Sequence, residues 1–120
     1  MALRVAINGF GRIGRLIFRS IVKDPSFEIV AINDITDATT LAHLLCFDSV
    51  YGRFDLPVRV DGDKIYVDGK KVKVLAMTDI QGSLWKDLGV DFIFESTGKY
   101  AKADKESHHL DSGARWVMIT

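Results

Sequence analysis

The chain has 120 residues, of which 48% are apolar and 27% are charged, and this composition is typical of one soluble globular domain or of part of a larger enzyme. Sixteen basic residues balance sixteen acidic ones, so the net charge gives no reason to expect nucleic acid or an anionic membrane as a partner. No apolar run reaches the roughly 20 residues of a membrane helix, and there is only one cysteine, which together favour a reducing, cytoplasmic location.

The first elements expected are a strand over residues 3–8 (LRVAIN) and a helix that begins near residue 12. In the strand, apolar and polar residues alternate, and the small Ala6 allows both faces to be buried, as in a central strand. Further on, apolar residues recur at three- and four-residue steps from Ile13 to Ile21, with basic residues between them. This pattern predicts an amphipathic helix whose apolar stripe contains Ile13.

A glycine-rich turn joins these two elements. Gly9, Gly11 and Gly14 have the spacing G-x-G-x-x-G, which is a weak signal by itself because 10 of the 120 residues are glycine. A strand before the turn and a helix after it form the context of a dinucleotide-binding site. The first glycine allows the turn, the second lets a pyrophosphate approach the backbone, and the third lets helix and strand pack closely. Amide groups at the start of the helix would face the phosphates.

Asp34 follows the second predicted strand, residues 27–33 (FEIVAIN), which begins after Asp24-Pro25-Ser26 ends the helix. The order strand, helix, strand predicts a right-handed crossover in a parallel sheet. Asp34 lies about 20 residues beyond Gly14, where a carboxylate accepts hydrogen bonds from the adenosine ribose and repels a 2′-phosphate. We therefore expect NAD rather than NADP, and the alternative is that Asp34 is only a helix-cap or turn residue.

A second helix is expected over residues 38–46, with Asp37 as a candidate cap. Cys46 lies beside leucines and is interpreted as a small core residue, because the spacing supplies no base to activate it as a nucleophile. His43, and the adjacent pair at 108–109, lack the spacing of a metal site. We therefore predict no metal site and no catalytic residue in this chain.

The middle of the chain changes pattern. Residues 47–54 (FDSVYGRF) are predicted to form a structured loop. Beyond it, three short stretches alternate apolar with polar residues and are separated by two Asp-Gly turns: 58–60, 65–67 and 72–74. These features predict an antiparallel meander inserted in an otherwise parallel sheet.

The last part of the chain returns to the earlier alternation, with a short helical turn, a strand, a helix and a final strand expected at 84–88, 90–95, 103–112 and 116–119. Ser96, Thr97 and Gly98 follow the strand at 90–95, and ligands bind at the carboxyl ends of such strands. The alternative for these three residues is an ordinary strand-to-loop turn. The elements together predict an α/β fold of the Rossmann type, a doubly wound, mostly parallel sheet with an inserted antiparallel meander.

Five blocks of the sequence closely resemble phosphorylating glyceraldehyde-3-phosphate dehydrogenase, the NAD-dependent glycolytic family. They are residues 5–15, 31–34, 48–54, 88–91 and 95–98. Their family-like spacing extends over essentially the whole chain, which makes them far more specific than the glycine motif alone. The resemblance implies NAD as the cofactor. Glyceraldehyde 3-phosphate, phosphate and the homotetramer are implied for the full-length protein only.

The resemblance also implies roles for matching residues. The backbone of residues 10–13 would hold the pyrophosphate, and Asp34 would hold the adenosine ribose. The family usually has Glu-Arg or Glu-Lys where this chain has Met77-Thr78, which removes a positive wall beside the adenine and leaves only a backbone contact at Thr78. Thr97 and Gly98 would line the nicotinamide half, and Thr120 would meet the cofactor. The expected cofactor-binding residues are Asn8, Gly9, Phe10, Gly11, Arg12, Ile13, Asp34, Thr78, Ser96, Thr97, Gly98 and Thr120.

The resemblance covers only the cofactor half of the family's chemistry. The Ser-Cys-Thr-Thr-Asn motif that carries the family's nucleophile is not found in the sequence. We therefore expect residues 1–120 to be an incomplete NAD-binding domain without the catalytic domain, inactive alone and self-associating through exposed apolar surface. One alternative is a non-catalytic NAD-binding or interaction module. Another is erythrose-4-phosphate dehydrogenase, which tends to carry glutamate in place of Asp34 and to lack the Glu-Ser-Thr-Gly of residues 95–98.

Overall fold

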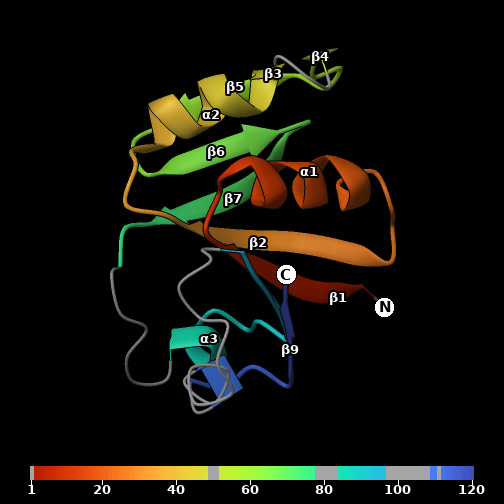
Figure 1. The fold of residues 1–120 in the computed structure, drawn as a ribbon, viewed down its shortest axis with the longest axis vertical. Helices are drawn as coiled ribbons and strands as arrows, with labels where there is room; N and C mark the ends of the chain where they lie inside the picture. The colour runs from red at the N-terminus through yellow and green to blue at the C-terminus, as the bar shows by residue number, and fades with distance from the viewer. Residues whose placement is uncertain (1, 49–51, 78–83, 97–108, 111) are drawn as a thin grey trace.

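The computed structural model describes residues 2–48, 52–77, 84–96, 109–110 and 112–120. Figure 1 shows a twisted sheet with helices packed beside it. Seven strands form the sheet in the order β5-β6-β7-β2-β1-β8-β9, and β3 and β4 pair separately. The elements in chain order are β1 (Leu3–Asn8), α1 (Arg12–Ile21), β2 (Phe27–Asn33), α2 (Ala38–Cys46), β3 (Phe47–Asp48), β4 (Gly52–Arg53), β5 (Val58–Asp61), β6 (Lys64–Val67), β7 (Lys70–Leu75), α3 (Leu84–Asp87), β8 (Phe92–Glu95) and β9 (Trp116–Ile119).

The centre of the sheet is parallel, as predicted. β1 pairs in parallel with β2 on one side and with β8 on the other, and β9 continues the parallel order beside β8. Val5, Ala6 and Ile7 of β1 are fully buried, because helices and loops cover both faces of this strand. The Rossmann-type α/β fold is confirmed.

The antiparallel meander is also confirmed, and it is continuous with the main sheet. β5 pairs with β6 and β6 with β7 in antiparallel register, while β7 pairs with β2 in parallel register. The turn between β6 and β7 has positive φ at both Asp68 (51°) and Gly69 (80°). Tight hairpins favour this conformation because its twist matches that of the strands it joins.

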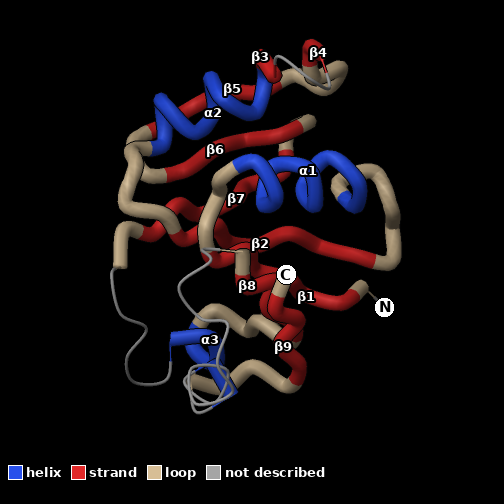
Figure 2. The backbone as a smooth tube through the Cα atoms, viewed as in Figure 1, coloured by secondary structure: helices blue, strands red, loops and turns tan. Residues whose placement is uncertain are grey.

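Two apolar cores lie on opposite faces of the sheet. One contains Phe18 of α1 and Leu41 of α2 together with Ile7 of β1. The other contains Trp85 of α3 with the small Ala6, the next-door neighbour of Ile7 on the strand. In Figure 2, α1 lies beside β7 and β2, α2 lies beside β5 and β6, and α3 lies at the β8–β9 end of the sheet.

The predicted apolar stripe of α1 is wrong at its first position. Gly14 and Phe18 are the buried residues of this helix, Ile17 and Ile21 are half-buried, and Ile13 is 50% exposed. Gly14 presses its backbone against the glycine turn, so the helix rotates that side inward. A prediction that counted Gly14 as a buried position would have included Phe18, one helical turn later, in the apolar stripe.

Other boundaries also differ from the prediction, and the meander strands β5, β6 and β7 are longer than the stretches predicted for them. The stretch 47–54 was expected to contain no strand, but it contains the two-residue strands β3 and β4, and the Arg19 side chain bonds the Gly52 carbonyl at 2.8 Å. The strand predicted over 90–95 begins at Phe92. Of the helix predicted at 103–112, the structure describes only 109–110 and 112. Among the described residues, no helix has the length and apolar character needed to cross a membrane.

Candidate functional site

The candidate site lies where three neighbouring parallel strands end at the same edge of the sheet. Asn8 is the last residue of β1, and it is in register with Asn33 at the end of β2 and with Glu95 at the end of β8. The glycine turn, Asp34 and Ser96 directly follow these three ends. The strand order runs from β1 to β2 on one side and from β1 to β8 on the other, so it reverses at β1. Ligands of open α/β sheets bind at such a topological switch point. The fold therefore brings these predicted residues together.

The three glycines of the turn have different geometries. Gly9 has a φ of 92°, which side chains disfavour. A Cβ on Gly14 would lie 2.2 Å from the carbonyl oxygen of Gly9, and the Ser96 hydroxyl donates to that same oxygen at 2.5 Å. The close helix–strand packing predicted for the third glycine is therefore confirmed. A Cβ on Gly11 would meet nothing within 4 Å, so the surface above it is open.

The start of α1 presents backbone amide groups to that open surface. Gly11 is the N-cap residue, no side chain caps the helix, and its first turn contains no acidic residue. The first amides of a helix have no acceptor within the helix, and they carry its positive dipole end. The amide of Phe10 is different, because it donates to Asp34 Oδ2 at 2.8 Å. The amides of Gly11, Arg12 and Ile13 are therefore the ones that can face an anion.

Asp34 joins the end of β2 to the glycine turn. Its Oδ2 accepts from the Phe10 amide, and its Oδ1 accepts from the Thr36 amide at 3.0 Å. The side chain is half-buried, so the carboxylate is fixed by these two bonds while it still reaches solvent. Each carboxylate oxygen can accept a second hydrogen bond. The arrangement suits the two hydroxyls of a ribose.

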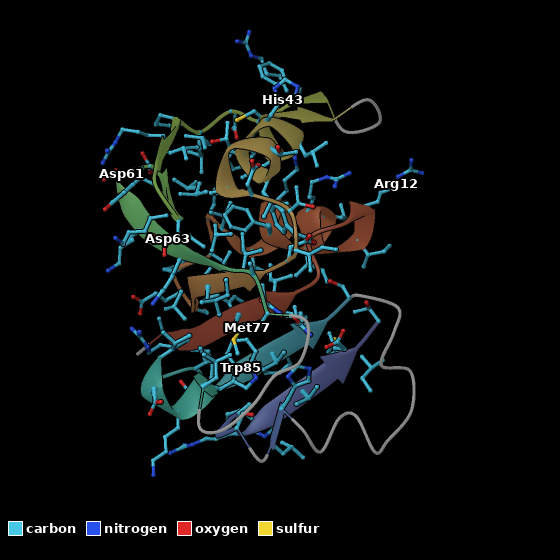
Figure 3. All side chains as sticks on the ribbon, turned by 90° about the vertical axis from the view of Figure 1, so that its left-hand side faces the viewer. Arg12, His43, Asp61, Asp63, Met77 and Trp85 are labelled. Atoms are coloured by element: carbon cyan, nitrogen blue, oxygen red, sulfur yellow. The ribbon has the colours of Figure 1, made fainter. Side chains whose placement is uncertain are left out.

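These features fit the dinucleotide NAD. The surface above Gly11 is open beside uncapped amides, as a pyrophosphate would need, and Asp34 follows the end of the neighbouring strand with its carboxylate in reach of solvent. The Arg12 side chain extends away from the molecule in Figure 3, so only its backbone lies at the turn.

Beneath this surface lies a buried cluster, the polar row, made of Asn33, Asn8, Glu95 and His109. All four residues are at most 4% exposed. Asn33 Nδ2 donates to Asn8 Oδ1 at 2.7 Å, and Asn8 Nδ2 donates to Glu95 Oε2 at 2.6 Å. His109 Nε2 lies 2.6 Å from the same Glu95 oxygen. The row thus crosses the ends of β2, β1 and β8 on the face of the second core.

Backbone and indole groups continue the polar row at both ends. The side-chain amide of Asn33 pairs with the Met77 backbone, accepting from its N–H and donating to its carbonyl, both at 2.9 Å. At the other end, Trp85 Nε1 donates to His109 Nδ1 at 3.0 Å. Figure 3 shows Met77 and Trp85 close together below the centre of the sheet, where both belong to the second core.

The predicted site residues are only partly brought together. Asn8 is buried in the polar row, so it supports the glycine turn from below. Thr120 is tied to the end of β8, because its N–H and hydroxyl both donate to the Glu95 carbonyl, at 3.0 and 3.1 Å. Thr78, Thr97 and Gly98 lie outside the described residues.

Sequence reasoning missed Asn33, Glu95 and His109 as members of a buried polar cluster. A signal was present, since two of the three central strands end in Ile-Asn and the third ends in Phe-Glu. A polar residue at the last position of a strand that is otherwise buried must find a partner in its neighbours. His109 gave no such signal, because only the fold brings it beside Trp85.

The other residues considered for chemistry lie elsewhere. Cys46 is half-buried at the end of α2, and this burial raises the pKa of its thiol despite the nearby Arg19 and Arg53. His43 packs against the ring of Phe47, 5.0 Å between centroids. Among the described residues, no group of three or more histidine, cysteine, aspartate or glutamate side chains could hold a metal ion. Cys46 thus behaves as a structural residue.

A groove of about 710 Å³ lies at the opposite end of the strands. Its walls come from the first residues of β1, β2 and β7, and its rim carries Lys70, Lys71 and an ion pair between Arg4 and Glu28 at 3.2 Å. The amino ends of parallel strands face away from the glycine turn. The groove is therefore separate from the candidate site.

Comparison with known proteins agrees with this geometry. Residues 3–103 match the family model described as "Glyceraldehyde 3-phosphate dehydrogenase, NAD binding domain". The glyceraldehyde-3-phosphate dehydrogenase of Geobacillus stearothermophilus is 50% identical over 120 residues, all of this chain, and that of Thermotoga maritima is 54% identical over 98% of it. Glyceraldehyde-3-phosphate dehydrogenase 1 of Bacillus subtilis is 48% identical over all of it.

The chain spans 36% of the length of each of these three relatives. The match covers the glycine turn, Asp34 and the ends of β1, β2 and β8, which are the parts that form the candidate site. The cofactor that the family model names, NAD, is also the one that the turn and Asp34 fit. The chain belongs to the glyceraldehyde 3-phosphate dehydrogenase family, as its NAD-binding domain.

Proposed function

We propose that this chain supplies the cofactor half of an enzyme that oxidises and phosphorylates glyceraldehyde 3-phosphate to 1,3-bisphosphoglycerate in glycolysis. The observation that carries the proposal is the placement of Asp34 beside an uncapped helix start, with the Asp34 carboxylate bonded to the Phe10 amide of the glycine turn. NAD bound there would accept the hydride released from the aldehyde carbon. The chain's own residues bind and orient that cofactor.

Each part of the site has a proposed task. The amides of Gly11, Arg12 and Ile13 bind the pyrophosphate, and Gly9 makes the turn that directs them to it. Asp34 accepts from the ribose hydroxyls and rejects a 2′-phosphate by charge. Phe10 anchors the turn, since its ring is buried against Phe18 and its amide is bonded to Asp34. The exposed Ile13 gives the cofactor an apolar surface at the start of α1.

The remaining predicted residues complete the nicotinamide and adenine sides. In this proposal Thr97 and Gly98 line the nicotinamide half beyond the end of β8, Thr120 meets the cofactor beyond the end of β9, and Thr78 contacts the adenine through its backbone. The hydroxyl of Ser96 is already engaged with Gly9, so its task is to hold β8 to the turn. Asn8 acts from beneath, through the polar row.

Calorimetry with NAD tests the site directly. Gly11 has a φ of −77°, and a Cβ there would meet nothing within 4 Å, so Gly11→Val is expected to fold and to fill the space proposed for the pyrophosphate. We expect NAD affinity to fall by at least about tenfold. Ser20→Val adds a similar side chain on the exposed side of the same helix and leaves affinity unchanged. Equal affinity for all three proteins would show that the site is misplaced.

A second candidate function for the 120-residue chain is a non-catalytic NAD-binding module. It is favoured by the pKa of Cys46, which burial raises, because a nucleophilic cysteine needs the opposite shift. An assay for NADH formation from glyceraldehyde 3-phosphate and phosphate separates the two. NADH production by the purified chain would exclude the module, and its absence together with NAD binding would support it.

We also propose a cytoplasmic location and self-association, with a homotetramer for the full-length protein. Trp116 and Met118 stand on the same side of the edge strand β9, and each is 50% exposed. Exposed apolar side chains of this kind favour contact with another copy. Light scattering is expected to give a mass above that of the 13.4 kDa chain, and a concentration-independent monomer would contradict the proposal.

A further inference from the structure

The hydrogen bonds of the polar row have a fixed direction. Both ends of the row are groups that can only donate, namely the backbone N–H of Met77 and the indole N–H of Trp85. A hydrogen-bond chain that starts from a donor at each end must meet at an acceptor between them. In this row the two arms meet at Glu95.

The arm from Met77 fixes two side-chain amides. The Met77 N–H requires an oxygen, so Asn33 turns Oδ1 to it and presents Nδ2 to Asn8 Oδ1. Asn8 then has only its Nδ2 for the next bond, which it donates to Glu95 Oε2 at 2.6 Å. The orientation of both amides therefore follows from one backbone group.

The arm from Trp85 fixes the tautomer of His109. The indole donates to Nδ1, so that nitrogen holds a lone pair and the ring proton is on Nε2. Nε2 then donates to Glu95 Oε2 at 2.6 Å. Oε2 thus receives two N–H groups and carries no proton. A carboxylate, whose charge is shared by both oxygens, accepts two donors at one oxygen more strongly than a neutral carboxyl group does.

We propose that Glu95 is an ionised positioning residue, which with neutral His109 holds the ends of β1 and β2 where the NAD site needs them. The proposal rests on the proposed function, that this site takes NAD. Hydrogen bonds to a charged acceptor are about twice as strong as neutral ones, and burial at 1% exposure strengthens them further. Apolar packing is non-directional, so by itself it would not fix the strand ends relative to one another in this way.

Through the polar row, Glu95 is linked to each of the segments that form the candidate site. Each strand-end member of the polar row directly precedes a site element, with Gly9 after Asn8 and Asp34 after Asn33. The backbone of Glu95 also accepts both hydrogen bonds from Thr120. A binding site tolerates displacements of only about 0.5 Å, so a loosened row reduces cofactor affinity before it unfolds the sheet.

The test compares the unaltered chain with Glu95→Gln and with Ile93→Val. Glu95→Gln keeps the side-chain volume and one acceptor oxygen but removes the charge. Ile93→Val is the matched control, since Ile93 is fully buried two residues earlier on the same face of β8 and packs in the second apolar core. Calorimetry measures NAD affinity, urea unfolding gives the folded fraction, and 15N NMR of the imidazole ring gives the tautomer of His109.

We expect the unaltered chain to show His109 neutral, with its proton on Nε2. Glu95→Gln is expected to weaken NAD binding by about tenfold after correction for the folded fraction, while Ile93→Val changes affinity less than twofold. A proton on Nδ1, or a cationic His109 ring at neutral pH, would overturn the proposal without any variant. Unchanged affinity in Glu95→Gln would also overturn it. If the unaltered chain fails to bind NAD, the proposed function fails and the positioning role with it.

Discussion

The two faces of the sheet use different chemistry at the same level of the strands. On the face under α1 and α2, Ile7, Ile32 and Phe94 lie in register across β1, β2 and β8 and pack into one apolar core. One residue further along each strand, on the opposite face, stands the polar row. The first face is held together by contacts that have no direction, and the second by hydrogen bonds that each have a donor and an acceptor.

This difference separates stability from position. Apolar burial stabilises a fold in proportion to area, and it tolerates small displacements of the packed groups. Buried hydrogen bonds contribute less net stability but lose strength steeply when their geometry changes. We therefore expect changes on the α1–α2 face to act mainly on unfolding, and changes in the polar row to act also on the cofactor site.

The largest effect on stability is expected from the α1–α2 face. Leu41 of α2 is 1% exposed in the first core, so Leu41→Ala should lower the free energy of unfolding by about 2–5 kcal/mol. Urea unfolding measures this loss, and NAD affinity of the folded fraction should stay unchanged. Leu56→Ala, at a half-buried residue on the margin of the same core, is the control and should cost less. A large loss of NAD affinity in the folded fraction of Leu41→Ala would contradict the view that the α1–α2 face acts mainly on stability.

The glycine turn joins the two faces, and a change there should affect both properties. Gly14→Ala places a methyl group 2.2 Å from the backbone oxygen of Gly9 and 3.0 Å from Ser96 Oγ. Backbone must shift to relieve this contact, at a cost of about 1–3 kcal/mol, and the NAD site shifts with it. Gly11→Ala is the matched control for stability, because its methyl group meets nothing within 4 Å. Thermal melting of the two variants should separate them, and equal melting temperatures would contradict the packing role of Gly14.

The polar row should respond to a change that alters charge but not shape. In Asn33→Asp an oxygen replaces Nδ2 and faces both the Asn8 oxygen and the Met77 carbonyl. We expect a loss of about 1–3 kcal/mol at neutral pH that becomes smaller in acid, since protonation of the introduced carboxyl restores one donor. Urea unfolding at several pH values measures it, with Asp63→Asn, an exposed change of the opposite kind, as the control. A loss that grows on acidification would refute the assigned direction of the row.

The smallest effect is expected at the N-cap of α2, Asp37, which belongs neither to the apolar core on the α1–α2 face nor to the polar row. Asp37 accepts from the Thr40 amide at 2.8 Å, and hydrogen bonds from the Thr40 side chain and then its backbone lower the pKa of this carboxyl. Because the folded pKa is depressed, its stabilisation is present above the unfolded value of about 3.9 and is lost as pH falls through the folded value. Asp37→Asn keeps the cap but removes the titrating group. The melting temperature of this variant should therefore fall less over that acid range than that of the unaltered chain, with a difference of a few degrees at most. An unchanged pH profile would contradict the shift.

Much of the fold could be predicted from local pattern. Helix α2 and the strands β2 and β9 have the predicted bounds, because their apolar spacing and the cap at Asp37 act within a few residues of the chain. The strand ahead of the glycine turn was correctly predicted as central, since the small Ala6 fits a strand with helices or loops on both faces.

The rest depended on contacts between distant residues. Phe18 was missed in α1 because the buried position one turn before it is a glycine, which periodicity does not count as apolar. The polar row was missed because Asn8 and Glu95 are 87 residues apart, and nothing local shows that they share one hydrogen bond. The glycine turn and Asp34 were recognisable as site candidates, but the bond between Asp34 and the Phe10 amide follows only from the pairing of β1 with β2.

The side chain of Asn33 substitutes for a peptide group. Its amide pairs with the N–H and carbonyl of Met77 as a neighbouring strand would, two residues beyond Leu75, the last paired residue of β7. The Asn33 side chain thus satisfies the two Met77 backbone groups, while the main chain that follows β2 makes one further bond to β7, from the Asp34 N–H to the Leu75 carbonyl at 2.9 Å. A designer who wished to end a buried strand next to a ligand could copy this arrangement, since a single asparagine side chain satisfies the backbone groups that lie beyond the last paired residues.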